Sequence, residues 1–211
     1  MYLSRVAIDS QNRRKIRDLM HLGAYHSWVE SCFPEELEEK VRSRKLWRID
    51  LLHGKKYLLL MSEKKPDLEV LEKYGIPGSA QTKPYDKFLE SIENNRTYRF
   101  RVTLNPVKSL SRGEGKRGRV VPVITAEQQI QFLESRAKRL GFELGPDEYQ
   151  ITERSWEPFA KQGQKMMRLC KVTYEGTLKV IDKDVFHRSL TEGIGKKKAY
   201  GFGLMTVIPV E

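Results

Sequence analysis

The sequence predicts an α+β fold made of two tandem ferredoxin-like (RRM-like) domains. The expected elements follow the order strand–helix–strand–strand–helix–strand in each half of the chain, which is the order of that fold. A length of 211 residues suits one large or two small domains, and the apolar fraction of 39% is enough for packed cores. We place the domain boundaries at residues 1–90 and 96–211.

The first half supplies one βαββαβ unit. Residues 2–8 are expected to form a short strand, and apolar residues spaced by three or four predict a helix over about residues 13–32. Residues 46–63 contain two apolar segments joined by a His-Gly-Lys turn, which is typical of a β-hairpin. A short helix is expected between Pro66 and Gly75, and residues 75–85 are rich in turn-forming residues without periodicity.

The second half repeats this order of elements without any similarity in sequence. Residues 97–107 alternate as a strand does, and residues 111–121 form a basic, glycine-rich loop. The clearest amphipathic helix begins after the N-cap candidate Thr125 and ends at Gly141. Two further strands, a short helix capped by Asp182 and a glycine-rich C-terminal segment complete the unit.

Charge indicates the class of partner. The chain has 39 Lys and Arg residues against 28 Asp and Glu, a formal net charge of +11, which favours nucleic acid before an anionic membrane. No apolar run approaches the roughly 20 residues that span a bilayer, and no signal peptide is recognisable. Cys32 and Cys170 are far apart and form no CxxC motif. We therefore expect a reduced, cytoplasmic protein without a membrane partner.

Common catalytic signatures are absent. The sequence contains no GxxxxGK[ST], GxGxxG, HExxH or GxSxG motif. His21 and His26 are five residues apart, which places them about 140° from each other on a helix and makes them a poor metal pair. The sequence therefore predicts no metal site and no small-molecule cofactor.

Three basic segments are candidates for binding a nucleic-acid backbone. Glycines allow a close backbone approach to an anion, and lysines supply charge, although a single segment of this kind is more often a solvated loop than a binding site. Three such segments in one half of a basic chain favour nucleic acid. Their candidate residues are Arg112, Lys116, Arg117 and Arg119; Lys161, Lys165, Arg168 and Lys171; and Gly193, Gly195, Lys196, Lys197, Lys198, Gly201 and Gly203.

Aromatic residues and histidine give weaker signals. Phe100 and Phe202 could stack on bases, but aromatic residues in strands usually lie in the core. His26 lies within the first expected helix, beside Tyr25. A single helical histidine is ordinarily structural, so the residue pattern alone does not make it catalytic.

Read together, several segments resemble the CRISPR-associated CasE family, the repeat-RNA endoribonuclease of type I-E Cascade. No single segment is specific, but they occur in the family's order over nearly the whole chain. They are MYLSRVAI, HSWVESCFP, FRVTLNPVKS, VPVITAEQQIQFLESRAKRLGF, VTYEGTLKVID and GIGKKKAYGFGLMTV.

The resemblance implies metal-independent cleavage of precursor CRISPR RNA at the base of each repeat hairpin. A 2′-hydroxyl would attack the adjacent phosphate and give a 2′,3′-cyclic phosphate and a 5′-hydroxyl. The family's catalytic histidine matches His26, and an imidazole can exchange protons near neutral pH. Whether it acts as the acid or the base is left open. The implied partners are the hairpin RNA and other Cascade subunits.

Two positions depart from the family pattern. Members often carry a tyrosine three residues before the histidine, where this chain has Gly23, and an arginine after it, where this chain has Ser27. The adjacent Tyr25 is the candidate substitute, or it simply packs. This difference keeps a second hypothesis open, a hairpin-RNA-binding subunit that does not cut. A third is a basic structural protein of a ribonucleoprotein.

For RNA binding, the resemblance assigns the hairpin stem to the basic strand pair around residues 161–171, near the loop at 112–119 and Lys108. The glycine-rich end matches the family's characteristic C-terminal loop. A-form stems present phosphates and shape more than readable bases, so basic side chains should dominate affinity.

Overall fold

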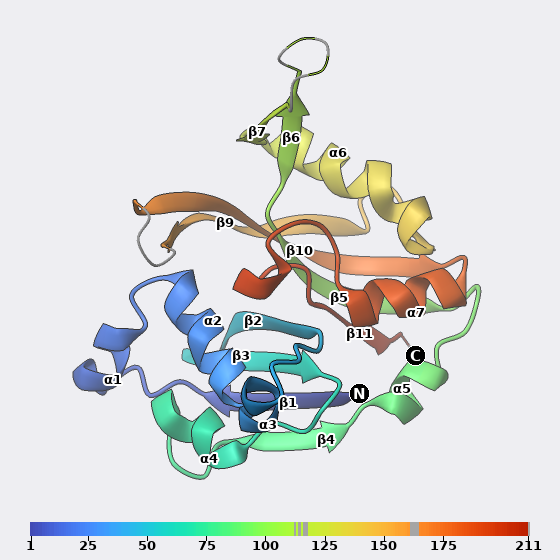
Figure 1. The fold of residues 1–211 in the computed structure, drawn as a ribbon. Coiled ribbons are helices and arrows are strands. Elements are labelled where there is room, and N and C mark those ends of the chain that lie inside the picture. The colour runs from blue at the N-terminus through green and yellow to red at the C-terminus, as the bar shows by residue number, and fades with distance from the viewer. Residues whose placement is uncertain (112, 114, 116–117, 161–164, 211) are drawn as a thin grey trace.

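The computed structural model describes residues 1–111, 113, 115, 118–160 and 165–210. Two antiparallel sheets lie one above the other in Figure 1, the lower from the first half of the chain and the upper from the second. Each follows the strand order of a ferredoxin-like fold, so the predicted tandem architecture is confirmed. The sequence-predicted boundaries at residues 90 and 96 stay a prediction.

The first sheet has the order β2-β3-β1-β4, and all neighbouring strands are antiparallel. Its central strand β1 pairs with β3 on one side and with β4 on the other. The β2–β3 hairpin turns where the sequence predicts, at His53 and Gly54, both with positive φ. The elements of this half are β1 (Tyr2–Ala7), α1 (Arg13–Asp18), α2 (Leu22–Ser31), α3 (Pro34–Glu38), β2 (Lys45–Leu52), β3 (Lys55–Ser62), α4 (Leu68–Leu71), η1 (Glu72–Tyr74), β4 (Gln81–Pro84) and α5 (Asp86–Glu90).

Two expectations for this half were wrong in detail. The single helix expected over residues 13–32 is divided into α1 and α2, because His21 has an extended backbone and caps α2. Its Nδ1 accepts a hydrogen bond from the Ala24 N–H at 3.2 Å. The aperiodic segment at residues 75–85 contains the edge strand β4, which is too short to show a period of two.

The second sheet has the order β11-β5-β10-β8, and β9 also pairs with β10. As predicted, Thr125 accepts from the Gln128 N–H at 3.3 Å at the start of α6, and Gly141, with φ +86°, ends the 3-10 turn that continues α6. Asp182 caps α7 as expected. The elements are β5 (Thr97–Leu104), β6 (Val107–Leu110), β7 (Arg119–Pro122), α6 (Ala126–Ala137), η2 (Lys138–Leu140), β8 (Phe142–Glu143), β9 (Tyr149–Phe159), β10 (Met167–Val180), α7 (Lys183–Glu192), η3 (Lys198–Tyr200) and β11 (Met205–Pro209).

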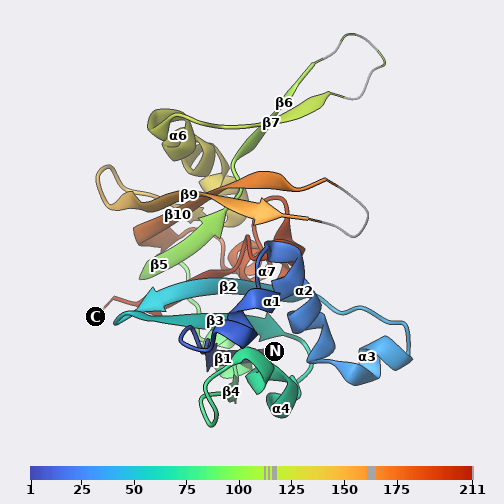
Figure 2. The same cartoon turned by 90° about the vertical axis from the view of Figure 1, so that its left-hand side faces the viewer.

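Strands β6 and β7, on either side of the glycine-rich basic segment of the second half, form a hairpin arm. Strands β6 and β7 pair with each other and project away from the upper sheet, as Figures 1 and 2 show from two directions. Most of the described side chains along this arm are exposed. A basic arm held away from the body has the shape and charge for contact with an extended partner.

The two halves share their hydrophobic cores. Leu46 and Met61 of the first sheet pack in one cluster with residues of the second, and Phe159 and Phe202 pack with α2 in the other. Phe100 and Phe202 are both buried, so the core interpretation of these two aromatics is confirmed. No helix in the described part of the chain is long and apolar enough to cross a membrane.

Candidate active site and nucleic-acid interface

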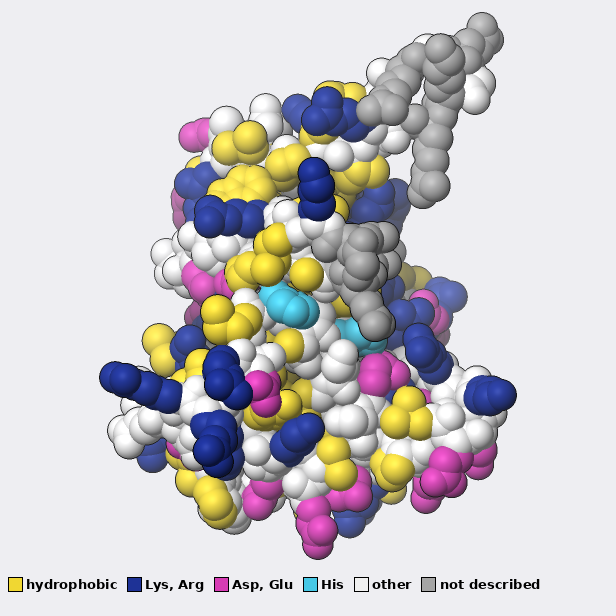
Figure 3. Space-filling view, turned by 60° about the vertical axis from the view of Figure 1, so that its left-hand side comes forward, with side chains coloured by type: hydrophobic (Ala, Val, Ile, Leu, Met, Phe, Trp, Pro, Cys, Tyr) yellow, Lys and Arg dark blue, Asp and Glu magenta, His cyan; other side chains and the backbone are white. Residues whose placement is uncertain are grey.

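His26 lies on α2, at the junction between the first half of the chain and the C-terminal loop. Its Nδ1 is 3.8 Å from Oε1 of Glu30, one helical turn further along. Its ring contacts that of Tyr200 edge to face, with centroids 5.1 Å apart. The side chain is 24% exposed, so it is partly enclosed and still reachable. Figure 3 shows histidine side chains on this face of the molecule, with Lys and Arg above and below them.

A chain of charged side chains extends inward from His26. The second carboxylate oxygen of Glu30 lies 3.6 Å from Nζ of Lys45, which is almost fully buried. Lys45 also donates to Glu36 at 2.6 Å and lies 4.8 Å from the centre of the Phe33 ring. Burial alone would raise the pKa of Glu36, but hydrogen bonds from Lys45 and Ser43 outweigh it and hold the pKa below its ordinary value.

Gly23 has a steric explanation. A Cβ built at this position would lie 2.4 Å from the carbonyl oxygen of Ala160, just after β9. Real Cβ atoms do not approach backbone oxygen so closely, so a tyrosine could be accommodated only if this part of the chain moved. The glycine lets the end of β9 lie directly against α2.

Tyr25 packs away from His26. Its ring stacks on Trp47, with centroids 5.8 Å apart, and its side chain lines the cavity between the two sheets. Burial raises the pKa of its hydroxyl, and the nearby Glu157 raises it further. A phenol with a raised pKa stays protonated near neutral pH and is not ready to accept a proton, so a catalytic role for Tyr25 remains a prediction from the sequence alone.

The C-terminal loop brings Tyr200 and two lysines to α2. Trp47 donates its indole N–H to the Ala199 carbonyl at 3.0 Å, which fixes η3 on the first sheet. Nζ of Lys197 lies 5.7 Å from the Tyr200 ring centre. Lys198 donates to the Glu192 carbonyl at 2.8 Å, and burial, together with the charge of Arg44, lowers its pKa.

Glycines of the C-terminal loop allow close packing against the first sheet. Gly193 and Gly201 have positive φ, and a Cβ on either would meet Leu46 or Trp47 at 2.6 Å. The Gly193 and Gly203 N–H groups already donate to protein carbonyls. These two amides are thus engaged within the protein, and RNA contact by this loop, including Gly193, Gly195 and Gly203, remains a prediction.

One groove unites predicted residues from different segments. Lys108 of β6 and Lys196 of the C-terminal loop both line a groove of about 650 Å³ between the hairpin arm and α6. Arg136 of α6 lines it too, and its guanidinium is held over the Phe132 ring at 3.7 Å. The groove is bordered by three cations, which suits a phosphate backbone.

The remaining predicted basic residues fall into three groups. Three of them are exposed: Arg119 on β7, Lys165 just before β10, and Arg168 on β10. Lys171 instead lies inside the cavity between the sheets, where it pairs with Glu153 at 2.9 Å. The last group lies outside the described residues: Arg112, Lys116, Arg117 and Lys161.

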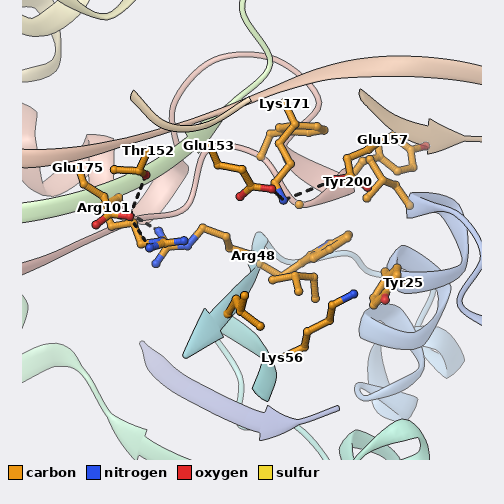
Figure 4. A pocket seen from close by; sticks show the side chains of 16 residues that line it. Tyr25, Arg48, Lys56, Arg101, Thr152, Glu153, Glu157, Lys171, Glu175 and Tyr200 are labelled. Atoms are coloured by element: carbon orange, nitrogen blue, oxygen red, sulfur yellow. Dashed lines mark hydrogen bonds and ion pairs between the residues drawn. The ribbon is translucent and has the colours of Figure 1, made fainter. Parts of the chain in front are cut away.

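The cavity between the sheets is about 470 Å³ and carries both charges (Figure 4). Lys171 faces two glutamates there, and Arg101 pairs with Glu175. Arg48 is buried behind it and bridges the two sheets. A wall with paired charges of both signs does not attract a polyanion, so this cavity is not part of the proposed RNA surface.

Cysteine and metal chemistry find no support among the described residues. Within them, no three His, Cys, Asp or Glu side chains are grouped as a metal site would require. Cys32 and Cys170 are buried, and burial with the charge of Asp67 raises the pKa of Cys32 to about 12. Neither thiol is poised as a nucleophile.

The fold and this surface define a protein of two tandem ferredoxin-like domains with a histidine beside a basic loop. The family described as CRISPR associated protein matches residues 1–209. The chain belongs to this family.

Individual relatives agree with this assignment. The chain is 29% identical to the CRISPR-associated endoribonuclease Cse3 of Thermus thermophilus, with 99% of this chain and 100% of that protein covered. A structure of Thermus thermophilus Cse3 bound to an RNA representing a pre-cleavage complex superimposes with a TM-score of 0.79 at 26% identity, covering 99% of this chain and 98% of that one. The Cas6e structure from Escherichia coli K-12 shares the fold, with a TM-score of 0.69 at 22% identity and full coverage of both chains.

Sequence reasoning missed three residues of this surface. One of them, Glu30, lies one helical turn from His26 on α2. The other two, Tyr200 and Arg136, belong to segments far from their neighbours in sequence. Only Glu30 left a signal in the sequence, because it follows His26 by four residues, the spacing of neighbours on one helical face.

Proposed function

We propose that this chain is a metal-independent endoribonuclease that cleaves precursor CRISPR RNA at the repeat hairpin. The observation that carries the proposal is the position of His26, partly exposed on α2 and in contact with Tyr200 of the lysine-bearing loop. The similarity over the whole chain to a protein named an endoribonuclease, and to its RNA-bound structure, supports the same reaction.

The proposed reaction uses only groups of the RNA and of the protein. The 2′-oxygen attacks the adjacent phosphorus, and the bond from phosphorus to the 5′-oxygen breaks, which leaves a 2′,3′-cyclic phosphate and a 5′-hydroxyl. The 2′-hydroxyl loses a proton, and the departing 5′-oxygen gains one. His26 can serve at either end of this exchange, because imidazole titrates near neutral pH.

The RNA stem is proposed to lie along the cations of the second half. Lys108, Arg136 and Lys196 line one groove, and Arg119 continues this basic character along the hairpin arm. Lys165 and Arg168 are exposed just before β10 and on its second residue, respectively. Contacts of this kind neutralise phosphates without reading bases, so they would position the stem while its shape provides selectivity.

The product is proposed to stay bound, in a complex with other Cascade subunits. A relative named Cascade subunit CasE from Escherichia coli K12 supports this, with 32% identity over 120 residues, 53% of this chain and 57% of that protein. We place the reaction in the cytoplasm, in keeping with two free, buried cysteines.

The test is cleavage of a labelled repeat-hairpin RNA in excess EDTA. We expect a single cut by the wild type and none by His26→Ala, with unchanged binding of the uncut hairpin. His53→Asn is the matched control, since His53 lies at the exposed β2–β3 turn with positive φ, which Asn tolerates. Analysis of the product ends should find the cyclic phosphate.

Other outcomes would contradict the proposal in different ways. Tight hairpin binding without a cut by the wild type would identify a binding subunit, the second hypothesis from the sequence. Equal binding of hairpin and random RNA would favour a basic structural protein. Cleavage lost in EDTA and restored by a divalent cation would refute metal independence.

A further inference from the structure

The charged groups behind His26 comprise more negative than positive charges. Glu30 and Glu36 are two carboxylates that share one cation, the buried Lys45. The three groups together carry one net negative charge when all are ionised. A positive imidazole at His26, 3.8 Å from Glu30, would neutralise it.

We propose that Glu30 is a positioning residue that keeps His26 protonated and commits it to the acid role, donating its proton to the departing 5′-oxygen. This inference rests on the proposed function, and it decides whether His26 acts as the acid or as the base. Lys45 acts one step further back. By pairing with Glu30 from the protein interior at 3.6 Å, it holds that carboxylate in place beside the imidazole.

The geometry also assigns the two ring nitrogens. Nδ1 of His26 faces Glu30, and the edge-to-face contact with Tyr200 fixes the plane of the ring. We assign Nε2, on the other side of the ring, to the RNA. The proton on Nε2 passes to the 5′-oxygen as its bond to phosphorus breaks, and the proton of the 2′-hydroxyl goes to solvent.

Other charges surround this pair and stay in place when Glu30 changes. Lys197 lies near the Tyr200 ring, and Lys198 interacts with Arg44. Glu157 of β9 acts on the neighbouring Tyr25. Glu30 pairs directly with His26, so Glu30→Gln removes a charge beside the imidazole and leaves the charges of these other groups unchanged.

The first arm of the test is a titration of the histidine rings by NMR in the protein without RNA. The signal that disappears in His26→Ala identifies this residue among the four histidines. We expect the pKa of His26 to lie above the reference value of about 6.5 in the wild type and to fall by about one unit in Glu30→Gln. Glu35→Gln is the matched control, because Glu35 lies on α3 and its side chain is 79% exposed.

The second arm is the single-turnover cleavage rate from pH 5.5 to 9. An acid with a pKa lowered by one unit is protonated about tenfold less often above that pKa, so Glu30→Gln should lose about tenfold at alkaline pH and approach the wild type at acid pH. Glu30→Asp keeps the charge on a shorter side chain and should recover part of the loss. Glu35→Gln should follow the wild type throughout.

Three results would overturn the inference. A variant that cleaves faster than the wild type at acid pH would make His26 the base. An equal loss at every pH, or no change in the His26 titration, would reduce Glu30 to a structural role. Failure of the wild type to cleave at any pH would refute the proposed function instead, while the NMR arm would still report whether Glu30 holds the proton on His26.

Discussion

Arg48 joins the two sheets through several hydrogen bonds of one buried side chain. It is buried on β2, and its guanidinium donates to the carbonyls of Arg101 and Leu204 at 2.8 and 2.9 Å. It also donates to Thr206 Oγ1 at 2.9 Å and forms a two-pronged pair with Asp50 at 2.7 and 2.8 Å. One side chain from the first sheet therefore satisfies acceptors on two strands of the second.

Replacing Arg48 by methionine should lower the free energy of unfolding by about 3–5 kcal/mol, the cost of removing one partner from a buried ion pair. Most of this loss of stability comes from the polar groups that remain buried after Arg48 is removed. Burial alone would raise the pKa of Asp50, but the hydrogen bonds and charge of Arg48, with the charges of Arg101 and Lys171, keep it below its ordinary value. Without Arg48, a carboxylate and two carbonyls remain enclosed with fewer donors.

The measurement is urea unfolding followed by tryptophan fluorescence, since Trp47 precedes Arg48 in the chain. Thr206→Val removes a single hydrogen-bond acceptor of Arg48 and should lower the free energy of unfolding by about 1–3 kcal/mol. It tests the same junction if Arg48→Met does not fold. The double variant Arg48→Met, Asp50→Leu should be more stable than Arg48→Met alone, because it leaves no unpaired charge. A loss below about 1 kcal/mol for Arg48→Met would refute this account of the junction.

Three further predictions follow. Gly23→Ala should lower stability by about 1–3 kcal/mol through overpacking against the end of β9, and should slow cleavage; an unchanged melting temperature would contradict the steric argument. The pKa of Glu36 is lower in the folded than in the unfolded protein, so its ionised carboxylate stabilises the fold above about pH 4.3. This stabilisation is lost as the pH falls through the folded pKa. Glu36→Gln should therefore make the free energy of unfolding, measured by chemical unfolding, depend less on pH on the acid side. Replacing Lys108 and Lys196 together by Glu should weaken hairpin binding and reduce its salt slope by about two, whereas Lys73→Glu on η1 should leave the slope unchanged.

Local signals predicted much of the fold. Thr125, Asp182 and Gly141 mark helix ends through hydrogen bonds and a positive φ that depend on a few neighbouring residues. The same holds for the turn at His53 and Gly54. Features of this kind depend on residues within one or two turns of the chain, so they can be recognised in a single sequence.

Features that depend on distant packing could not be predicted in this way. The apolar spacing across residues 13–32 continues through the break before α2, and only the backbone at His21 reveals the interruption. Strand β4 exists because β1 offers it a pairing edge, although its own four residues lack alternation. The groove that joins Lys108 to Lys196 likewise requires the tertiary fold, since 87 residues of sequence intervene between them.

Gly23 shows how the structure changes the meaning of a residue. In the sequence it looks like a missing catalytic group, because the resembling family often has tyrosine there. In the structure its hydrogen is what allows the carbonyl of Ala160 to approach α2, so the position is occupied by backbone and has no room for a phenol. In the mechanism we propose, the proton chemistry at this end of α2 is therefore assigned to His26, with the carboxylate of Glu30 facing it. A carboxylate paired with a buried lysine is a coherent alternative to a tyrosine, because in the proposed mechanism it would set the protonation state of the histidine without contacting the RNA.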